Sequence, residues 1–130
     1  MTERQTRKPV VTAIQAVHSA VFLVELGAIG WLVYTGLVGR RDRTAGLAAG
    51  LVAAEGLVWL ANAGVCPLTP LAERYGAAQG SVSDIWLPDA IARTIPQWSI
   101  PLVVLGVVLH IRSSLRAGAP SRLSPWQEAR

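Results

Sequence analysis

The sequence predicts an all-α membrane protein with about three transmembrane helices and an amphipathic helical segment between the second and the third. Two observations predict this fold. Hydrophobic residues make up 52% of the 130 residues and charged residues only 15%, whereas about a quarter is usual in a soluble domain. The charges also gather in short clusters between long apolar runs, which is the membrane pattern. We therefore expect the lipid bilayer to be the main partner of the chain.

The basic residues flank the apolar runs. The net charge is +4, but ten of the twelve basic residues lie beside an apolar run and no continuous basic face is visible. This distribution argues against a nucleic-acid partner. The hairpin after the first run and the C-terminal tail carry seven of the twelve, and the other side carries five. The positive-inside tendency therefore favours a cytoplasmic hairpin.

The first apolar run extends from Val10 to Val38, and Pro9 is expected to limit the helix upstream. About 20 helical residues span a bilayer core, so this run is long enough. It is too long for the apolar part of a secretory signal, and no small-residue cleavage site follows it. We expect a retained first span.

A tight basic hairpin, residues 39–44, leads to the second span. That span is expected from Ala45 to Val65, where Cys66-Pro67 would end it because the residue before proline disfavours helix. The third span is expected from Ile95 to Ile111. These predictions divide the chain into a polar N-terminal tail, a transmembrane helical domain and a flexible C-terminal tail, with bounds 1–9, 10–115 and 116–130.

The segment between the second and third spans is too polar to cross the membrane. Thr69-Pro70 is expected to cap and begin a short helix that ends near Gly76. Residues 85–87 and 90–91 are apolar, with the acidic Asp89 between them. They are expected to lie on the membrane surface, with Trp86 at the level of the lipid headgroups.

Two glutamates lie near the middle of predicted spans. An ionisable group at that depth is costly and is a functional-site hypothesis by default. Glu25 and Glu55 are expected to be neutral at pH 7 or to share a proton. Helical spacing extends each into a stripe: Gln15, His18, Phe22 and Glu25 on the first span, and Glu55, Trp59, Asn62 and Cys66 on the second. If the stripes face each other, they form a polar seam that opens toward the loop after the second span.

Three interpretations of this seam stay open. Protonated glutamates can hydrogen-bond across a helix pair as a packing device. The seam can instead be a proton-linked or ligand-binding pocket, or a face that meets a partner subunit. The candidate residues for a ligand or proton site are His18, Glu25, Glu55, Trp59, Asn62 and Cys66. On another face of the second span, Gly46 and Gly50 have a spacing that allows close packing of the third span or of another chain.

The sequence predicts no cofactor and no metal site. His18 and His110 are expected in opposite leaflets, roughly 20 Å apart along the membrane normal, so one chain should not hold a bis-histidine haem. A haem across a homodimer stays open. His110 is expected to be an interfacial cation beside Arg112. The single cysteine excludes an intrachain disulfide, and no hydrolase, zinc or phosphate-loop motif is present. An enzyme using a Cys66 thiolate is the weakest alternative.

Three segments carry a resemblance to a known family: residues 64–76, 84–88 and 95–96. They contain Cys66-Pro67-Leu68-Thr69, and the chain from residue 50 to 111 resembles a family of uncharacterised small bacterial membrane proteins. In that family a Cys-Pro-Leu-Thr motif closes a transmembrane helix, and a short acidic helix, a Gly-rich turn and a last span follow. The resemblance implies three spans in the bacterial cytoplasmic membrane. It also implies that the motif covers the polar seam, with Glu73 and Asp84 nearby.

The sequence therefore predicts a small integral membrane protein that is not an enzyme. It is expected to bind a small amphiphile, or to be an accessory subunit of a larger membrane complex. The alternative is a homo-oligomeric proton-coupled transporter that uses the mid-membrane glutamates, because three spans are too few to enclose a pathway alone.

Overall fold

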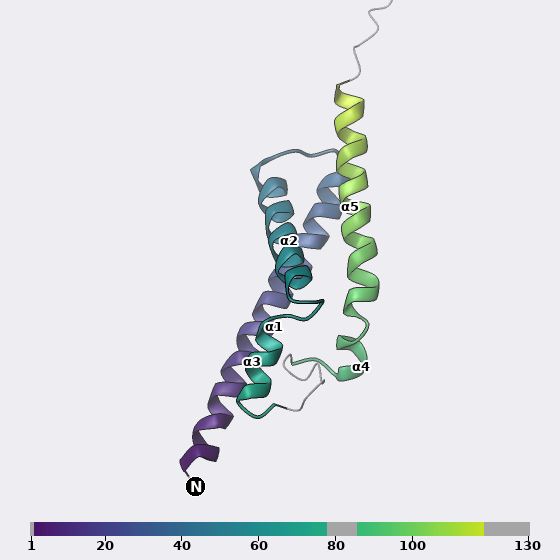
Figure 1. The fold of residues 1–130 in the computed structure, drawn as a ribbon. Helices are drawn as coiled ribbons and strands as arrows, with labels where there is room; N and C mark the ends of the chain where they lie inside the picture. Colours follow the sequence, from purple (N-terminus) through teal and green to yellow (C-terminus); the bar gives the residue numbers. More distant parts are fainter. Residues whose placement is uncertain (1, 78–85, 119–130) are drawn as a thin grey trace, which may run out of the picture.

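The computed structural model describes residues 2–77 and 86–118. The predicted fold class is confirmed, because the described elements are all helices and three of them are long and apolar enough to cross a membrane. The helices are α1 (Thr2–Leu37), α2 (Arg43–Ala61), α3 (Leu68–Arg74), α4 (Asp89–Ala92) and α5 (Ile95–Ala117). Figure 1 shows α1 as the longest element, with α2 and α5 beside its C-terminal half and α3 beside its N-terminal half.

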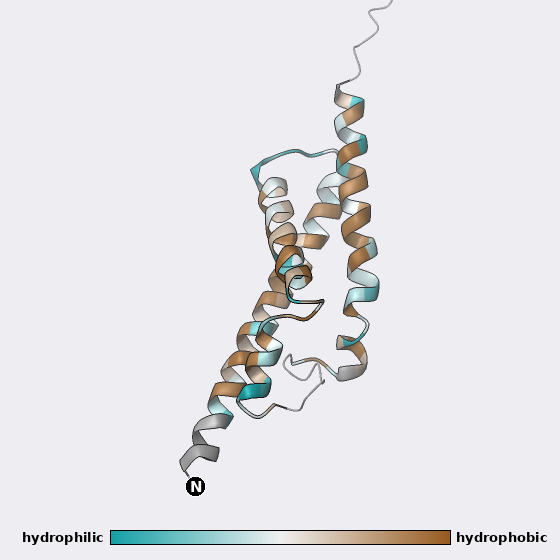
Figure 2. Ribbon diagram, in the orientation of Figure 1, coloured by the Kyte–Doolittle hydropathy of each residue, from teal (hydrophilic) through white to brown (hydrophobic). Residues whose placement is uncertain are grey.

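The three long helices expose many large apolar side chains, as helices surrounded by lipid do. Figure 2 shows hydrophobic residues along these helices and hydrophilic residues at the hairpin between α1 and α2. The few buried side chains lie mainly on α1 and α2 and are mostly small, such as Ala28, Ala45 and Ala48. Small side chains let helix backbones approach closely in a membrane, where packing rather than the hydrophobic effect holds helices together.

The helix α1 begins at Thr2 and runs through Pro9, so the expectation that Pro9 limits the helix upstream is wrong. A proline inside a helix removes one backbone hydrogen bond and crowds the preceding turn, but the turns on either side keep their own bonds. Its 36 residues give α1 a length of about 54 Å, whereas a bilayer core is about 30 Å thick.

The hairpin between α1 and α2 is fixed at both ends by capping. Gly39 has a φ of +67°, and the Arg40 N–H donates to the Thr35 carbonyl at 2.8 Å, which is a Schellman end for α1. Asp42 then caps α2 by accepting from the N–H groups of Thr44 and Ala45, each at 3.1 Å. The chain therefore reverses within a few residues.

The helix α2 ends at Ala61, four residues before the predicted end at Val65. A second Schellman motif ends it, because the Gly64 N–H donates to the Trp59 carbonyl at 2.9 Å while Ala63 takes a φ of +56°. The expectation that Cys66-Pro67 ends this helix is therefore wrong. Sequence reasoning missed Gly64 as the sign of this helix end. Glycine usually fills the left-handed position of the motif, but here Ala63 occupies that position and Gly64 follows it.

The short helix predicted after the second span is present as α3, but it begins at Leu68 with Pro67 at the N-cap rather than Thr69. Gly76, with a φ of +101°, follows its end. The surface-lying segment predicted over residues 85–91 is described only from Trp86, which is 64% exposed. The backbone N–H of Trp86 donates to the buried Ser19 hydroxyl of α1 at 3.0 Å, so this segment is attached to α1.

The helix α5 begins at Ile95, as predicted, but continues to Ala117 instead of ending near Ile111. The apolar pattern ends at Ile111 because the polar residues after it face water, yet serine and arginine are compatible with a helix. The hydroxyls of Ser113 and Ser114 donate to the His110 carbonyl at 3.0 and 2.8 Å, within the helix.

Two glycines let α1 and α5 approach closely. A Cβ on Gly36 would lie 2.8 Å from the Leu109 Cβ, and a Cβ on Gly106 would lie 3.1 Å from the Leu32 Cγ. By contrast, a Cβ on Gly46 or Gly50 would meet nothing within 4 Å. The close helix contact within this chain therefore uses Gly36 and Gly106, and the predicted Gly46 and Gly50 pair does not pack the third span.

We predict that Gly36→Ala destabilises the fold by about 1–3 kcal/mol, because the new methyl group would collide with the stiff Cβ of Leu109. Gly46→Ala is the matched control, since it adds the same methyl group in open space and favours helix. The measurement is the midpoint of unfolding in mixed micelles, followed by circular dichroism. Equal midpoints for the two variants would contradict this close contact between α1 and α5.

Candidate functional site

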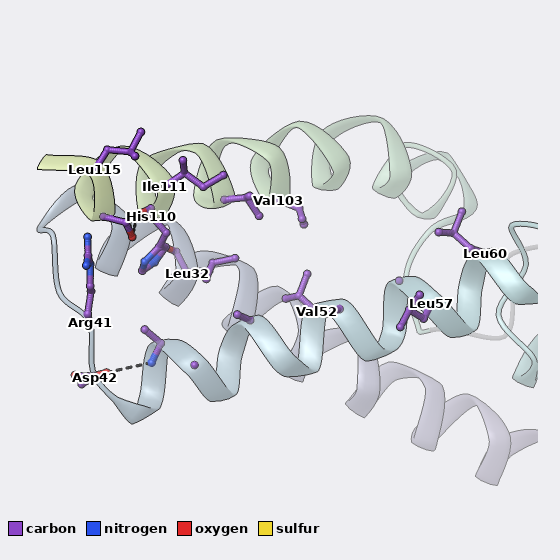
Figure 3. Close-up of a pocket in the computed structure, with 17 residues that line it drawn as sticks. Leu32, Arg41, Asp42, Val52, Leu57, Leu60, Val103, His110, Ile111 and Leu115 are labelled. Carbon is purple, nitrogen blue, oxygen red and sulfur yellow. Dashed lines mark hydrogen bonds between the residues drawn. The ribbon is translucent and has the colours of Figure 1, made fainter. Parts of the chain in front are cut away.

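A groove runs between α2 and α5. Both helices pack against α1 but make few contacts with each other. The space left between them has a volume of about 930 Å³, and Leu32 of α1 contributes to its lining (Figure 3). This volume lies within the range of 300–1,000 Å³ that is usual for small-molecule sites.

Five of the eight α2 residues that line the groove are glycine or alanine, which helps to keep the groove open. Gly46, Ala49, Ala53 and Gly56 follow a spacing of three or four residues, so they lie on one face of the helix. The opposite wall on α5 is built from larger residues at a spacing of four: Val103, Val107, Ile111 and Leu115. The small α2 side chains cannot reach this wall, and the space between the helices stays unfilled.

The groove is polar at one end only. Of the 17 residues that line it, four are polar: Arg41, Asp42, His110 and Ser114. All four lie at the end nearest the hairpin, and the other 13 are apolar or glycine. Figure 3 shows Arg41, Asp42 and His110 together at this end, with Val52, Val103 and Leu60 farther along the groove. The groove is therefore polar at its hairpin end and apolar along the rest of its length, which is complementary to the polarity of an amphiphile.

The carboxylate of Asp42 is already satisfied. It accepts from the Thr44 hydroxyl and from two backbone N–H groups, and it forms an ion pair with Arg40 at 2.6 Å. The Thr44 hydroxyl and the Ala45 N–H, with the Arg40 guanidinium beside them, lower the pKa of Asp42 from 3.8 to about 2. The Thr44 hydroxyl in turn accepts from the Trp31 indole at 3.0 Å, which joins α1 to the start of α2.

Arg41 is the cation at the mouth of the groove. It is exposed, and its guanidinium donates one long hydrogen bond of 3.4 Å to the Ser113 hydroxyl of α5. Arg40 differs, because it pairs with Asp42 and lies 5.9 Å over the Trp31 ring. Within residues 2–77 and 86–118, no ion pair neutralises Arg41.

His110 is oriented by α1. Its Nε2 lies 3.1 Å from both the Leu32 carbonyl and the Thr35 hydroxyl. A carbonyl can only accept, so Nε2 carries a proton and donates. The Thr35 hydroxyl is fully buried and donates to the Trp31 carbonyl at 2.8 Å, so its oxygen can share the Nε2 proton with the Leu32 carbonyl as a second acceptor. The ring therefore faces α1, and the expectation that His110 is a cation stays a prediction.

The two glutamates predicted for the seam lie close to each other. Glu25 of α1 and Glu55 of α2 are both half-buried, and their carboxyl groups interact electrostatically. The other six residues of the two stripes are half-buried as well. Gln15 and His18, nearer the N-terminus of α1, each interact with a neighbouring group. The role of this seam as a proton or ligand site stays a prediction.

The residues predicted at the loop end of the seam take part in ending α2. The Trp59 ring lies against Gly64, where a Cβ would be 3.4 Å from it. The Asn62 side-chain amide donates to the Val65 carbonyl at 2.7 Å. Cys66 follows as a half-buried free thiol. Asp84, which the family resemblance places near this end, lies outside the described residues.

The described part of the chain holds no group of three or more His, Cys, Asp or Glu side chains placed to bind a metal ion. The two histidines are also far apart. Thr35, the α1 contact of His110, lies 17 residues beyond His18, which corresponds to roughly 25 Å along the helix axis. A single haem cannot use both imidazoles of one chain at this separation.

The groove is the feature that sequence reasoning missed. Its signals in the sequence are a run of small residues on one face of the second span and an arginine beside that span. Small residues are frequent in membrane helices, and they indicate close packing as readily as an open groove. The way α2 and α5 both pack against α1 decides between these outcomes.

The fold and the groove define a small helical membrane protein. No protein-family model matches the chain, and no curated protein or solved structure matches it either. A functional proposal therefore rests on the groove and the two glutamates.

Asp42 should produce a pH-dependent stability between about pH 4 and pH 2. Because the pKa of Asp42 is lower in the folded chain than in the unfolded one, its carboxylate stabilises the fold above pH 3.8. This contribution is lost as the pH falls through about 2. In Asp42→Asn, which keeps a capping side chain but cannot titrate, the step in unfolding midpoint over this range should disappear. Glu73→Gln is the control and should keep the step; its loss there would refute the assignment.

Proposed function

We propose that the protein is a non-enzymatic membrane protein that binds one amphiphile from the bilayer in the groove between α2 and α5. The observation that carries this proposal is the polarity of the groove, whose polar residues all lie at its hairpin end. An amphiphile in the membrane has the same arrangement, with its head at the surface and its tail in the core. The resemblance to small bacterial membrane proteins supports the bacterial cytoplasmic membrane as the location.

The dimensions of the groove support an acyl chain as the tail. The lining on α2 extends from Ala45 to Leu60, which is about 22 Å along the helix axis. Half of a bilayer core is about 15 Å thick, so one acyl chain fits along the groove with its head at the hairpin. The groove opens sideways between two helices that cross the membrane, and an amphiphile can enter it without leaving the lipid.

Filling the groove should prevent this binding. We predict that the double substitution of Ala49→Leu and Ala53→Leu lowers retention of a single phospholipid by roughly tenfold, since overfilling a packed site costs about 1–3 kcal/mol. Native mass spectrometry of the full chain released from lipid nanodiscs measures the retained lipid. The control adds the same volume to another face of α2, with Ala54→Leu and Ala61→Leu, and should retain lipid as the wild type does. Wild-type protein without retained lipid would refute the proposal.

A second function is supported by a separate observation. Glu25 and Glu55 interact across the α1 and α2 pair, at a depth where carboxyl groups commonly mark proton pathways. A homo-oligomer of this chain could then work as a proton-coupled transporter, with the pathway completed between copies. Glutamates that serve only to pack the helices would tolerate glutamine, because the protonated acid and the amide form similar hydrogen bonds.

The transporter hypothesis predicts that Glu25→Gln and Glu55→Gln each abolish proton flux into liposomes that contain the protein. A pH-sensitive dye trapped inside the liposomes reports the flux under an imposed pH gradient. Glu73→Gln, which changes a carboxyl group on α3, serves as the control and should leave the flux intact. Wild-type liposomes that are no more permeable to protons than empty ones would exclude this function.

A further inference from the structure

The apolar body of the groove cannot by itself choose among lipids. Lipid tails are as apolar as the side chains that line the groove, so moving a tail from the bilayer into the groove gains no hydrophobic free energy. What differs between one membrane lipid and another at this site is the head. The selectivity of the groove must therefore come from the polar residues at its hairpin end.

The hairpin end of the bundle is strongly basic. Five arginines lie in the hairpin, in the first turn of α2 or in the last turns of α5: Arg40, Arg41, Arg43, Arg112 and Arg116. The described acidic side chain at this end is Asp42, and its carboxylate is taken by the α2 cap and by Arg40. An anionic head placed here meets a positive field that no other carboxylate among the described residues at this end cancels.

Arg41 is the arginine that lines the groove itself. Figure 3 shows its side chain at the hairpin end of the groove, extending toward α5. The hydrogen bond that it donates to Ser113 is long, at 3.4 Å, so little is lost when the guanidinium turns to another acceptor. A guanidinium can hold a phosphate through two parallel hydrogen bonds, which a lysine cannot do.

We propose that the occupant of the groove is an anionic phospholipid, whose phosphate binds Arg41 and whose acyl chain lies along α2 toward Leu60. This inference rests on the proposed function, since it names the class of amphiphile. The lipid comes from the leaflet on the hairpin side of the membrane. A zwitterionic lipid of the same tail length fits the same groove but gains less at its mouth, because its own cation opposes Arg41.

The test is a competition between two lipids with identical acyl chains. The full-length protein is placed in nanodiscs with equal amounts of phosphatidylglycerol and phosphatidylcholine, and native mass spectrometry identifies the retained lipid. The wild type should retain phosphatidylglycerol in preference. Arg41→Gln should reduce this preference about fivefold, the factor expected for one arginine near an anionic lipid head. Arg41→Lys, which keeps the charge but not the paired hydrogen bonds, should fall between the two.

Arg43→Gln is the matched control. It removes the same charge from the same end of the bundle, but Arg43 does not line the groove, so the preference should stay near that of the wild type. Equal losses for the two glutamine variants would overturn the inference and leave only a general surface attraction. Wild-type protein that retains both lipids equally would also overturn it, while the proposed function would stand.

A second measurement locates the bound lipid. Phosphatidylglycerol with a photoreactive group halfway along one acyl chain should cross-link to the groove faces of α2 and α5 in the wild type. In the double variant with Ala49→Leu and Ala53→Leu, that cross-link should be lost. Wild-type protein that retains no lipid, or that forms a dimer in which the groove faces cross-link to each other, would overturn both this inference and the proposed function.

Discussion

The close approach of α1 and α5 at Gly36 is the constraint on which the rest of the arrangement depends. A Cβ at this position would lie 2.8 Å from Leu109, so the two helices are in contact almost at the level of their backbones. The helix α2 also packs against α1, and its small residues Ala45 and Ala48 are buried. Because α1 holds both neighbours, nothing needs to fill the space between them, and the groove is the result.

The same contact determines which end of the groove is polar. It brings His110 within hydrogen-bond distance of the Leu32 carbonyl and the Thr35 hydroxyl, near the C-terminal end of α1. The hairpin after α1 then places Arg41 and Asp42 at this end. The contact between α1 and α5, the His110 side chain and the hairpin therefore meet at the same end of the helix bundle. The opposite end of the groove, near Leu60 and Val103, holds apolar residues only.

Local patterns in the sequence were sufficient to predict the long helices. Apolar runs between charge clusters predicted the three spans, and Glu25 and Glu55, expected near the middle of adjacent spans, interact electrostatically in the structure. The sequence was insufficient to predict which glycines make a close helix contact, because glycine occurs both at such contacts and beside open space. Gly46 and Gly50 have the spacing of a packing motif but border open space, whereas Gly36 and Gly106, which make the close contact, lie on different helices. The end of α2 was misplaced for a related reason, since the left-handed turn at Ala63 precedes the more conspicuous Cys66-Pro67.

The groove opens to the side, between helices long enough to cross a bilayer. Binding to it is therefore measured against the concentration of an occupant in the membrane. An occupant that reaches the groove by lateral diffusion never passes through water, so its occupancy follows its mole fraction in one leaflet and not an aqueous concentration. Every other lipid in that leaflet competes for the same space. A difference of only about 1.4 kcal/mol between two lipids then corresponds to a tenfold difference in occupancy when both are equally abundant. The lipid found in such a groove would therefore depend on the lipid composition of that leaflet.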